Sequence, residues 1–325
     1  MKLRVGLIGL GNAWQTRHRP ALRMLQNRFE VRAVYNAIAK LSDACAAEFQ
    51  ADLVGGYRAL VSRSDIDAVM ILQETWQGWL PVIAACEAGK AIYWAGDLRF
   101  DPGEHSRILE MVESSGVAFM AEFTRRFAPA TLRLKELIAT KLGQPSLLFC
   151  HRRISPNAQS KVQESDQELI ELIDWCRFVV GREPKQVTSM AHNENECVDY
   201  CSVTLHFAAT DHAPAATAQL SCGSYIPDSW HEANSFRPPA AMQVRCERGI
   251  AFVDLPSSLV WFDDAGRHME ALETESPVGE QLLIHFHRSV TSLVRNLANL
   301  DDACKAVEIL AAAKQSSKAG TTIKL

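Results

Sequence analysis

The sequence predicts an α/β chain with a parallel-sheet domain at residues 1–122 and an α+β domain with a large, mostly antiparallel open sheet at residues 123–325. In the first part, short apolar strands alternate with helices, which is typical of a parallel sheet covered on both faces. After about Phe123, successive strands show period-two patterning, as in an antiparallel sheet with one face packed on helices. The length of 325 residues allows two hydrophobic cores.

In the first domain, each expected strand is a short apolar run and each expected helix has helical periodicity. The strands are expected at Leu3–Ile8, Val31–Tyr35, Ala68–Leu72, Ala91–Trp94 and Ala118–Met120. The helices are expected at about Asn12–Gln26, Ala39–Phe49, Gly78–Ala88 and Pro102–Ser115. The last of these follows an N-cap aspartate, Asp101, begins with proline and ends before Gly116, all of which are helix-boundary signals.

In the second domain, the pattern predicts helices on one side of a long run of strands. Helices are expected at about Pro129–Lys141, Gln167–Val180, Glu280–Leu297 and Asp301–Lys318. Strands are expected at Leu147–Arg153, Gln186–Met190, Val198–Phe207, Ala215–Ser221, Met242–Cys246, Ile250–Val253, Leu259–Phe262 and Thr321–Lys324. No low-complexity linker separates the domains, so we expect them to dock and form a cleft.

Composition excludes several classes of protein. The chain is 47% hydrophobic and 22% charged, which argues against disorder. Its net charge of -4 gives no electrostatic reason to expect nucleic acid or an anionic membrane as partner. No apolar run is long enough to span a bilayer, and the N-terminus lacks a signal-peptide core. These features predict a cytoplasmic protein.

The nine cysteines predict neither disulfides nor a metal site. Their number is odd, and several lie in expected helices as small core residues. Cys197, Cys201, His206 and His212 superficially resemble a zinc site, but the strand pattern places Cys201 and His206 on opposite faces. We therefore expect reduced thiols and no metal.

The first strand runs directly into a Gly-x-Gly turn, which is how a Rossmann dinucleotide-binding domain begins. Gly9 permits the tight turn, and Gly11 allows the backbone to approach a pyrophosphate at the N-terminus of the next helix. Asn12 and Ala13 complete the expected loop. NAD or NADP is the expected cofactor; the alternative is that the two glycines only make a turn.

Two departures at this expected site predict weak binding with little preference between NAD and NADP. The third loop position, normally Gly or Ala, is Trp14, whose indole must tilt the first helix or project toward the cofactor path. Asn36 replaces the acidic residue that usually binds the ribose hydroxyls. Asn36 can hydrogen-bond a ribose but cannot reject a 2′-phosphate by charge; alternatively, it is a turn residue without a ligand.

Over its whole length the chain resembles the Gfo/Idh/MocA family, which includes glucose–fructose oxidoreductase and inositol dehydrogenase. The resemblance rests on the order and spacing of motifs: Gly9-Leu10-Gly11, Pro20-Ala21-Leu22, Asp65-Ile66-Asp67-Ala68-Val69, Glu87-Ala88-Gly89-Lys90, Arg125-Arg126-Phe127-Ala128-Pro129, Asp174-Trp175 to Gly181, Glu247 to Val253 and Ala306 to Leu310. It implies hydride transfer between NAD(P) and a sugar, polyol or related alcohol. It also implies a dimer or tetramer that packs through the second-domain sheet.

The residues that this resemblance assigns to catalysis are replaced. A lysine after the fourth strand maps to Gly96, and an aspartate and a histidine in the second domain map to Gln167 and Glu171. Asp174 is retained, whereas a histidine often found earlier maps to Gly78. Losing an acid–base group typically costs about 10² to 10⁴ in rate, so ordinary polyol oxidation needs replacements.

Glu171 is the expected replacement, because a half-buried carboxylate can act as acid or base. Glu122, Asp97 and Arg126 are weaker candidates, and for each of them a structural salt bridge or cap is the favoured interpretation. The run His151–Arg153 reads as a solvated strand end, while Tyr225, Trp230 and His231 lie in a loop that could cover the cleft or an interface.

Two hypotheses remain for this small-molecule-binding chain. The first is an NAD(P)-dependent oxidoreductase with a remodelled centre. The second is a non-catalytic nucleotide- or sugar-binding protein with a regulatory or scaffold role.

Overall fold

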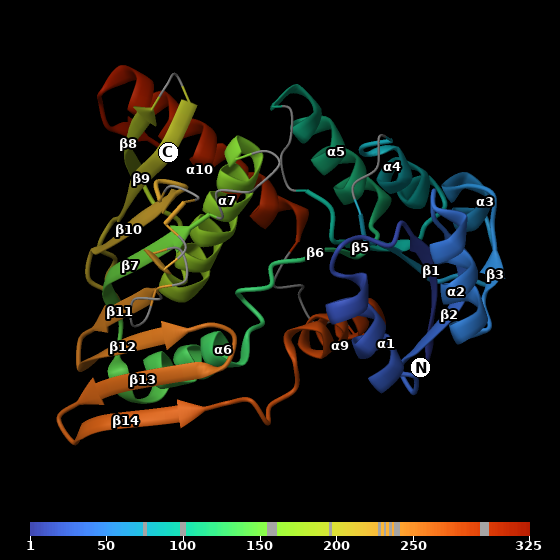
Figure 1. Cartoon of the computed structure of the whole chain (residues 1–325), viewed down its shortest axis with the longest axis horizontal. Helices are drawn as coiled ribbons and strands as arrows, with labels where there is room; N and C mark the ends of the chain where they lie inside the picture. The colour runs from blue at the N-terminus through green and yellow to red at the C-terminus, as the bar shows by residue number, and fades with distance from the viewer. Residues whose placement is uncertain are drawn as a thin grey trace. The chain divides into compact units, whose positions relative to one another are not determined.

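The computed structural model describes residues 1–73, 77–97, 102–154, 161–194, 197–226, 229–230, 232–233, 236, 241–292 and 299–325. The chain forms two compact units (Figure 1). Unit 1 comprises Met1–Thr124 and Ser276–Cys304, and unit 2 comprises Arg125–Glu275 and Lys305–Leu325. Ser276–Cys304 thus groups with the N-terminal unit, although the sequence analysis assigned all of 123–325 to one domain. That division into folding domains stays a prediction.

Unit 1 contains a six-stranded parallel sheet in the order β3-β2-β1-β4-β5-β6 (Figure 1). The strands are β1 (Leu3–Ile8), β2 (Phe29–Tyr35), β3 (Asp52–Leu53), β4 (Ala68–Ile71), β5 (Ala91–Trp94) and β6 (Phe119–Ala121). Strands β1, β4, β5 and β6 are almost entirely buried, as apolar parallel strands between helical layers should be. The parallel sheet expected from the sequence is confirmed.

The helices of unit 1 are η1 (Trp14–His18), α1 (Arg19–Met24), α2 (Ala39–Phe49), α3 (Tyr57–Val61), α4 (Leu80–Glu87), α5 (Pro102–Ser115) and α9 (Val278–Thr291). The expected helix from Asn12 to Gln26 is a π-helical turn, η1, followed by α1. Gly116 ends α5 with a φ of 67°, as expected of a C-terminal glycine, whereas Asp101 lies outside the described residues.

Unit 2 contains a nine-stranded sheet in the order β14-β13-β12-β11-β7-β10-β9-β8-β15 (Figure 1). The strands are β7 (Pro145–Arg153), β8 (Gln186–Glu194), β9 (Cys197–Phe207), β10 (Ala216–Gly223), β11 (Met242–Cys246), β12 (Gly249–Asp254), β13 (Ser258–Asp263), β14 (Gly266–Ala271) and β15 (Ile323–Lys324). All neighbouring pairs are antiparallel except β7 and β10, which are parallel. The fold class expected from the sequence is confirmed.

One face of this sheet packs on helices and the other carries exposed apolar side chains. The helices of unit 2 are α6 (Pro129–Leu137), η2 (Ile138–Leu142) and α7 (Lys161–Val180), and α10 (Leu300–Ala319) begins in unit 1 and continues in unit 2. Helix α7 contacts β7 and β10, and α6 contacts β12 and β13. The strand register places Leu147, Phe149, Met190, Phe262 and Met269 together on the opposite face, where all five are exposed.

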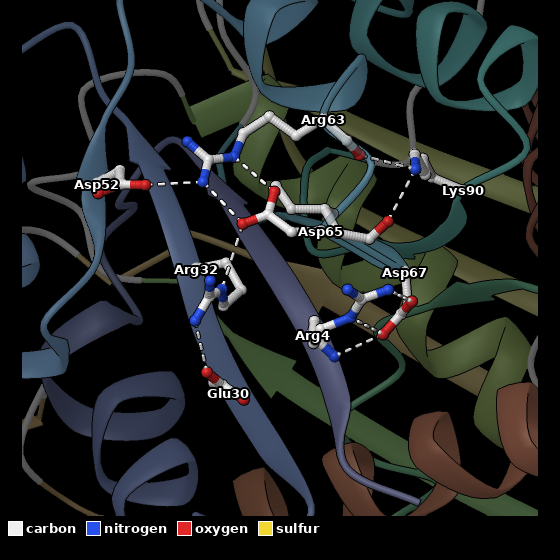
Figure 2. A network of polar contacts seen from close by, with 9 residues as sticks. Arg4, Glu30, Arg32, Asp52, Arg63, Asp65, Asp67 and Lys90 are labelled. Atoms are coloured by element: carbon white, nitrogen blue, oxygen red, sulfur yellow. Dashed lines mark hydrogen bonds and ion pairs between the residues drawn. The ribbon is translucent and has the colours of Figure 1, made fainter.

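An ionic network holds the amino-terminal ends of the strands in unit 1 (Figure 2). Arg4, at the start of β1, pairs with Asp67, whose carboxylate also accepts the backbone N–H of Arg4 at 3.0 Å. Arg63 pairs with Asp65, and Lys90 donates to the carbonyl oxygens of Arg63 and Ile66. Three residues that carried the family resemblance, Asp65, Asp67 and Lys90, are therefore structural here.

Candidate functional site

The expected dinucleotide loop lies at the carboxyl end of β1. Gly9 has a φ of 72°, a left-handed conformation that favours glycine, and its N–H donates to the Tyr35 carbonyl at 2.8 Å. A Cβ added at Gly11 would lie 2.4 Å from the carbonyl oxygen of Leu72, which follows β4. Gly11 is therefore required by packing of the loop against a neighbouring strand end.

The Trp14 side chain lies in the interior of unit 1. Its indole is 4% exposed and packs edge-on against Phe49 of α2, with ring centroids 6.0 Å apart. The chain around it forms the π-helical turn η1, in which the N–H of His18 donates to the Ala13 carbonyl at 3.3 Å. A π turn is wider than an α turn, so it accommodates a large side chain where a glycine is usual.

The other loop residues differ in exposure. Asn12 is exposed, and Ala13 is half-buried at the N-cap of η1. The side-chain oxygen of Asn36 accepts the N–H of Leu10 at 3.4 Å, and its amide nitrogen donates to the Ile38 carbonyl at 3.3 Å. Asn36 therefore ties the glycine loop to the end of β2. A carboxamide retains a second N–H and a second acceptor lone pair, so this role is compatible with a ribose contact.

Gly96, at the mapped lysine position, is enclosed by an aromatic pair. A Cβ added there would lie 2.6 Å from Cζ2 of Trp94. The Trp94 indole stacks on Trp79 with centroids 4.4 Å apart and an interplanar angle of 14°, and its Nε1 donates to the Asp97 carbonyl at 3.2 Å. Because the stacking on Trp79 and the hydrogen bond to Asp97 both hold the indole in place, no side chain fits at position 96 without rearrangement.

Glu122, one of the weaker sequence candidates, is buried among polar partners in unit 1. Its carboxylate accepts from Arg17, from Nε2 of His18 at 2.6 Å and from the Tyr93 hydroxyl at 2.6 Å. Burial alone would raise the pKa of Glu122, but the hydrogen bond from His18 and the charges beside it outweigh burial and lower the pKa to about 2. Glu122 is therefore a fixed carboxylate and not a proton donor near neutral pH.

Gln167 and Glu171 both lie on α7 in unit 2, whereas Gly96 belongs to unit 1. Glu171 pairs with Arg125 at 2.5 Å, and its side chain is 19% exposed. Arg125 also pairs with Glu168, one turn earlier on α7, at 2.5 Å. Burial lowers the pKa of Arg125, but the two carboxylates overcome this effect and raise it. The structure thus joins Glu171 to Arg125, a residue of the Arg125–Pro129 motif for which the sequence predicted no role at the site.

A second, fully buried pair lies farther along α7. Arg126 binds Asp174 through Nε at 2.6 Å and through a second nitrogen, and Arg177 lies 3.6 Å from the same carboxylate. Trp175 donates to Thr131 at 3.0 Å. The retained Asp174 therefore holds α7 to the segment before α6. Arg126, which the sequence analysis considered as an anion ligand, is instead a structural partner of Asp174.

The end of β7 carries a histidine that is not simply solvated. His151 Nδ1 lies 2.8 Å from the Ser221 hydroxyl, and its Nε2 lies 2.9 Å from the hydroxyl of Tyr225. Burial and the nearby Arg153 lower the pKa of His151. An adjacent hollow of about 910 Å³ is lined by Arg153, Tyr225, Ile226, Ser229, Trp230, Glu232, Ala233 and Phe236; His231 lies outside the described residues.

The cysteines and helices give no sign of a metal site or a membrane span within the described ranges. Cys201 pairs across the sheet with Cys222, and His206 pairs with Thr217, so the two side chains point to opposite faces. In the described part of the chain, no three His, Cys, Asp or Glu side chains gather as metal ligands would. Among the same residues, no helix has the length and hydropathy that a bilayer-spanning segment requires.

Comparison with solved structures shows the same fold in proteins of low sequence identity. An NAD-binding oxidoreductase from Klebsiella pneumoniae superposes with a TM-score of 0.82, 18% identity and coverage of 99% of this chain and 98% of that one. An aldose-aldose oxidoreductase from Caulobacter crescentus gives a TM-score of 0.82 at 14% identity, with 100% of both chains covered. At these identities the likeness concerns the fold alone.

Sequence comparison finds partial matches to known dehydrogenases. Inositol 2-dehydrogenase from Cereibacter sphaeroides is 29% identical over 188 residues, which cover 56% of this chain and 55% of the relative. That from Acidothermus cellulolyticus is 28% identical over 199 residues, covering 59% and 58%. Residues 3–123 match the family GFO_IDH_MocA, described as an oxidoreductase family with an NAD-binding Rossmann fold. Over these residues the chain is similar to the Gfo/Idh/MocA family.

The match to these dehydrogenases is partial. It spans a little over half the length of each curated relative, 55% and 58% respectively. The family-model match ends at residue 123, so it includes the glycine loop and Gly96 but not Gln167 or Glu171. The family-model match therefore supports a dinucleotide-binding frame, while activity and substrate have to be argued from this chain's own side chains.

Proposed function

We propose that this chain binds a nicotinamide dinucleotide at the carboxyl-end edge of its parallel sheet. The observation that carries the proposal is the loop from Gly9 to Ala13. Its left-handed Gly9 and tightly packed Gly11 stand within the region that matches an NAD-binding family. Asn36 lacks the charge that selects against a 2′-phosphate, so the site accepts either NAD or NADP. Binding of both is weak, because Asn36 replaces the charged ribose ligand.

The proposed ligand beside the nucleotide is a sugar, polyol or related alcohol, as in the dehydrogenases that the chain resembles. Hydride transfer from an alcohol needs a base for the hydroxyl proton and a group that stabilises the developing alkoxide. Gly96 supplies neither, and Gln167 can only hydrogen-bond. Glu171 is the one ionisable residue of the three, and its carboxylate is already paired with Arg125.

We therefore propose an oxidoreductase frame with no appreciable turnover of common sugars or inositols. Any residual activity would use Glu171 as the base, with Arg125 available to balance charge. A second candidate is a non-catalytic nucleotide- or sugar-binding protein. Two observations favour it: the Trp94 indole fills the space for a side chain at position 96, and Arg125 occupies the Glu171 carboxylate.

The proposal is tested by assaying a panel of sugars and inositols with NAD and NADP, using the wild type, Glu171→Gln and Glu168→Gln. Glu168 is the matched control because it also pairs with Arg125 but does not occupy a mapped catalytic position. We expect activity at or near background. Weak activity, if present, should vanish in Glu171→Gln and persist in Glu168→Gln. Robust turnover that survives Glu171→Gln would show that the active site has been mapped wrongly.

A further inference from the structure

Four side chains of unit 1 form a buried ionic cluster that the proposed catalytic positions do not use. Glu122 follows the last strand of the parallel sheet, Tyr93 lies on β5, and Arg17 and His18 lie on η1. His18, Tyr93 and Glu122 are buried, whereas the Arg17 side chain is 32% exposed. The cluster therefore joins the turn after the glycine loop to residues more than 70 positions later, in and after β5 and β6.

The hydrogen atoms of this cluster are fixed by its chemistry. An ionised carboxylate only accepts hydrogen bonds, so Nε2 of His18, the Tyr93 hydroxyl and the Arg17 guanidinium must all donate to Glu122. Nδ1 of His18 is buried and has no partner among the described residues. Within the described part of the chain, the hydrogen bond that orients the imidazole thus runs to Glu122. Removing the Glu122 charge would weaken the anchoring of both η1 side chains.

Two further contacts restrain η1. Trp14, its first residue, packs against Phe49 of α2. Gly279, in the first turn of α9, approaches so closely that an added Cβ would lie 2.7 Å from the carbonyl oxygen of Arg17. These contacts pack η1 against α2 and α9 but set no direction for its polar side chains. Glu122 supplies directed bonds, two of which end on η1 itself.

The stability of the unit alone does not explain this cluster. A buried charge with its partners is often no more stabilising than apolar side chains of similar volume, so such clusters are weak evidence for stability. Directed bonds do, however, fix orientation. The segment immediately before η1 contains Gly9 and Gly11, residues with the greatest backbone freedom, and this freedom must be removed for its N–H groups to face a phosphate.

We propose that Glu122 is a positioning residue of the dinucleotide site. Through Arg17 and His18 it fixes η1, and η1 in turn fixes the loop from Gly9 to Ala13 in the conformation that receives the pyrophosphate. The inference rests on the proposed dinucleotide binding. It adds that the affinity of the loop depends on a carboxylate that follows β6, three strands away from β1 in the sheet, and that the glycine motif does not contain.

The test compares Glu122→Gln and Arg17→Met with Asp67→Asn as the matched control. Asp67 takes part in an ionic pair of the same unit, but with Arg4 at the amino-terminal ends of the strands. Amide hydrogen exchange of residues 9–18 is measured by mass spectrometry without nucleotide, and NADH affinity by fluorescence titration. In both cluster variants, we expect exchange in this segment to rise about tenfold and the NADH Kd to rise about tenfold or more. In Asp67→Asn, both should stay within about twofold of the wild type.

Several outcomes decide the proposal. Unchanged exchange of residues 9–18 in Arg17→Met overturns it, and that variant remains informative if Glu122→Gln does not fold, because Arg17 is partly exposed. Partial recovery in Arg17→Lys supports it, since lysine keeps a donor to Glu122. If the wild type binds no nucleotide but the loop still loosens in the variants, the proposed function fails while the positioning of the loop is supported. An equal loss of affinity in Asp67→Asn would show a general stability effect and overturn the proposal.

Discussion

Position 96, where the family resemblance places a lysine, is closed by a neighbouring side chain. The sequence shows that glycine stands where the family's lysine is expected, but not that the space is filled. Trp94, two residues earlier, lies over Gly96 and is held by Trp79 and by the Asp97 carbonyl. Restoring a lysine there would therefore require a change at Trp94 as well.

We expect Gly96→Ala to lower the free energy of unfolding by about 1–3 kcal/mol, because the new methyl group overlaps a restrained indole. The measurement is urea denaturation followed by circular dichroism. Gly55→Ala is the control, since a Cβ at Gly55 meets no atom within 4 Å. The structural account of position 96 fails if the two substitutions change stability equally.

At the scale of elements, the amino-terminal ends of the strands in unit 1 are joined by the ionic network of Figure 2. The hydrogen bond and charge of Arg4 lower the pKa of Asp67, although partial burial opposes the shift. Because the folded-state pKa lies below the unfolded value of about 3.9, the stabilisation is complete above that pH. It is lost as pH falls through the lower, folded-state pKa.

We therefore expect the unfolding free energy of the wild type to fall more steeply below about pH 4 than that of Asp67→Asn. Urea denaturation at a series of pH values between about 2 and 7 measures this difference. Asp254→Asn, at an exposed strand end in unit 2, is the control and should retain the wild-type slope. Parallel curves for the wild type and Asp67→Asn would contradict the assigned role.

Elements with a clear apolar pattern were predictable, whereas elements without one, or with irregular backbone, were not. The bounds of β1, β5, α2, α5 and β11 agree with the sequence prediction. The two-residue strand β3 and the strand β14 are largely exposed. Neither has the apolar pattern from which a strand could be predicted. The π turn η1 could not be predicted because Trp14 signals crowding without specifying how the backbone relieves it.

The candidate site was predictable only in part. The glycine loop follows from a local pattern, since Gly9 and Gly11 adjoin a recognisable strand. The ion pairs of Glu171 with Arg125 and of Glu122 with Arg17 join residues 46 and 105 positions apart. A single sequence contains no signal for such pairings. The one available hint was the spacing of Glu168, Glu171 and Asp174, which share a face of α7.

At the scale of the whole molecule, the open face of the unit 2 sheet predicts self-association. Five exposed apolar side chains share this face, and apolar side chains left exposed on an open sheet are typical of an interface. We expect a homo-oligomer at micromolar concentration by analytical sedimentation, and dissociation in Phe149→Glu. Met24→Glu, at an exposed methionine on α1, is the control and should leave the assembly intact. A monomeric wild type would refute association through this sheet.

The account's central claim is that a dinucleotide site persists although the usual catalytic residues are replaced. Calorimetric titration of the purified protein with NADH and NADPH tests it most directly. Asn36 replaces a charge-assisted contact, whose loss costs about 1.5–3 kcal/mol, or about ten- to a hundredfold in affinity. We expect binding of both nucleotides with micromolar or weaker affinity and no strong preference between them. Submicromolar binding with a clear preference for NADH, or no binding of either nucleotide, would contradict the account.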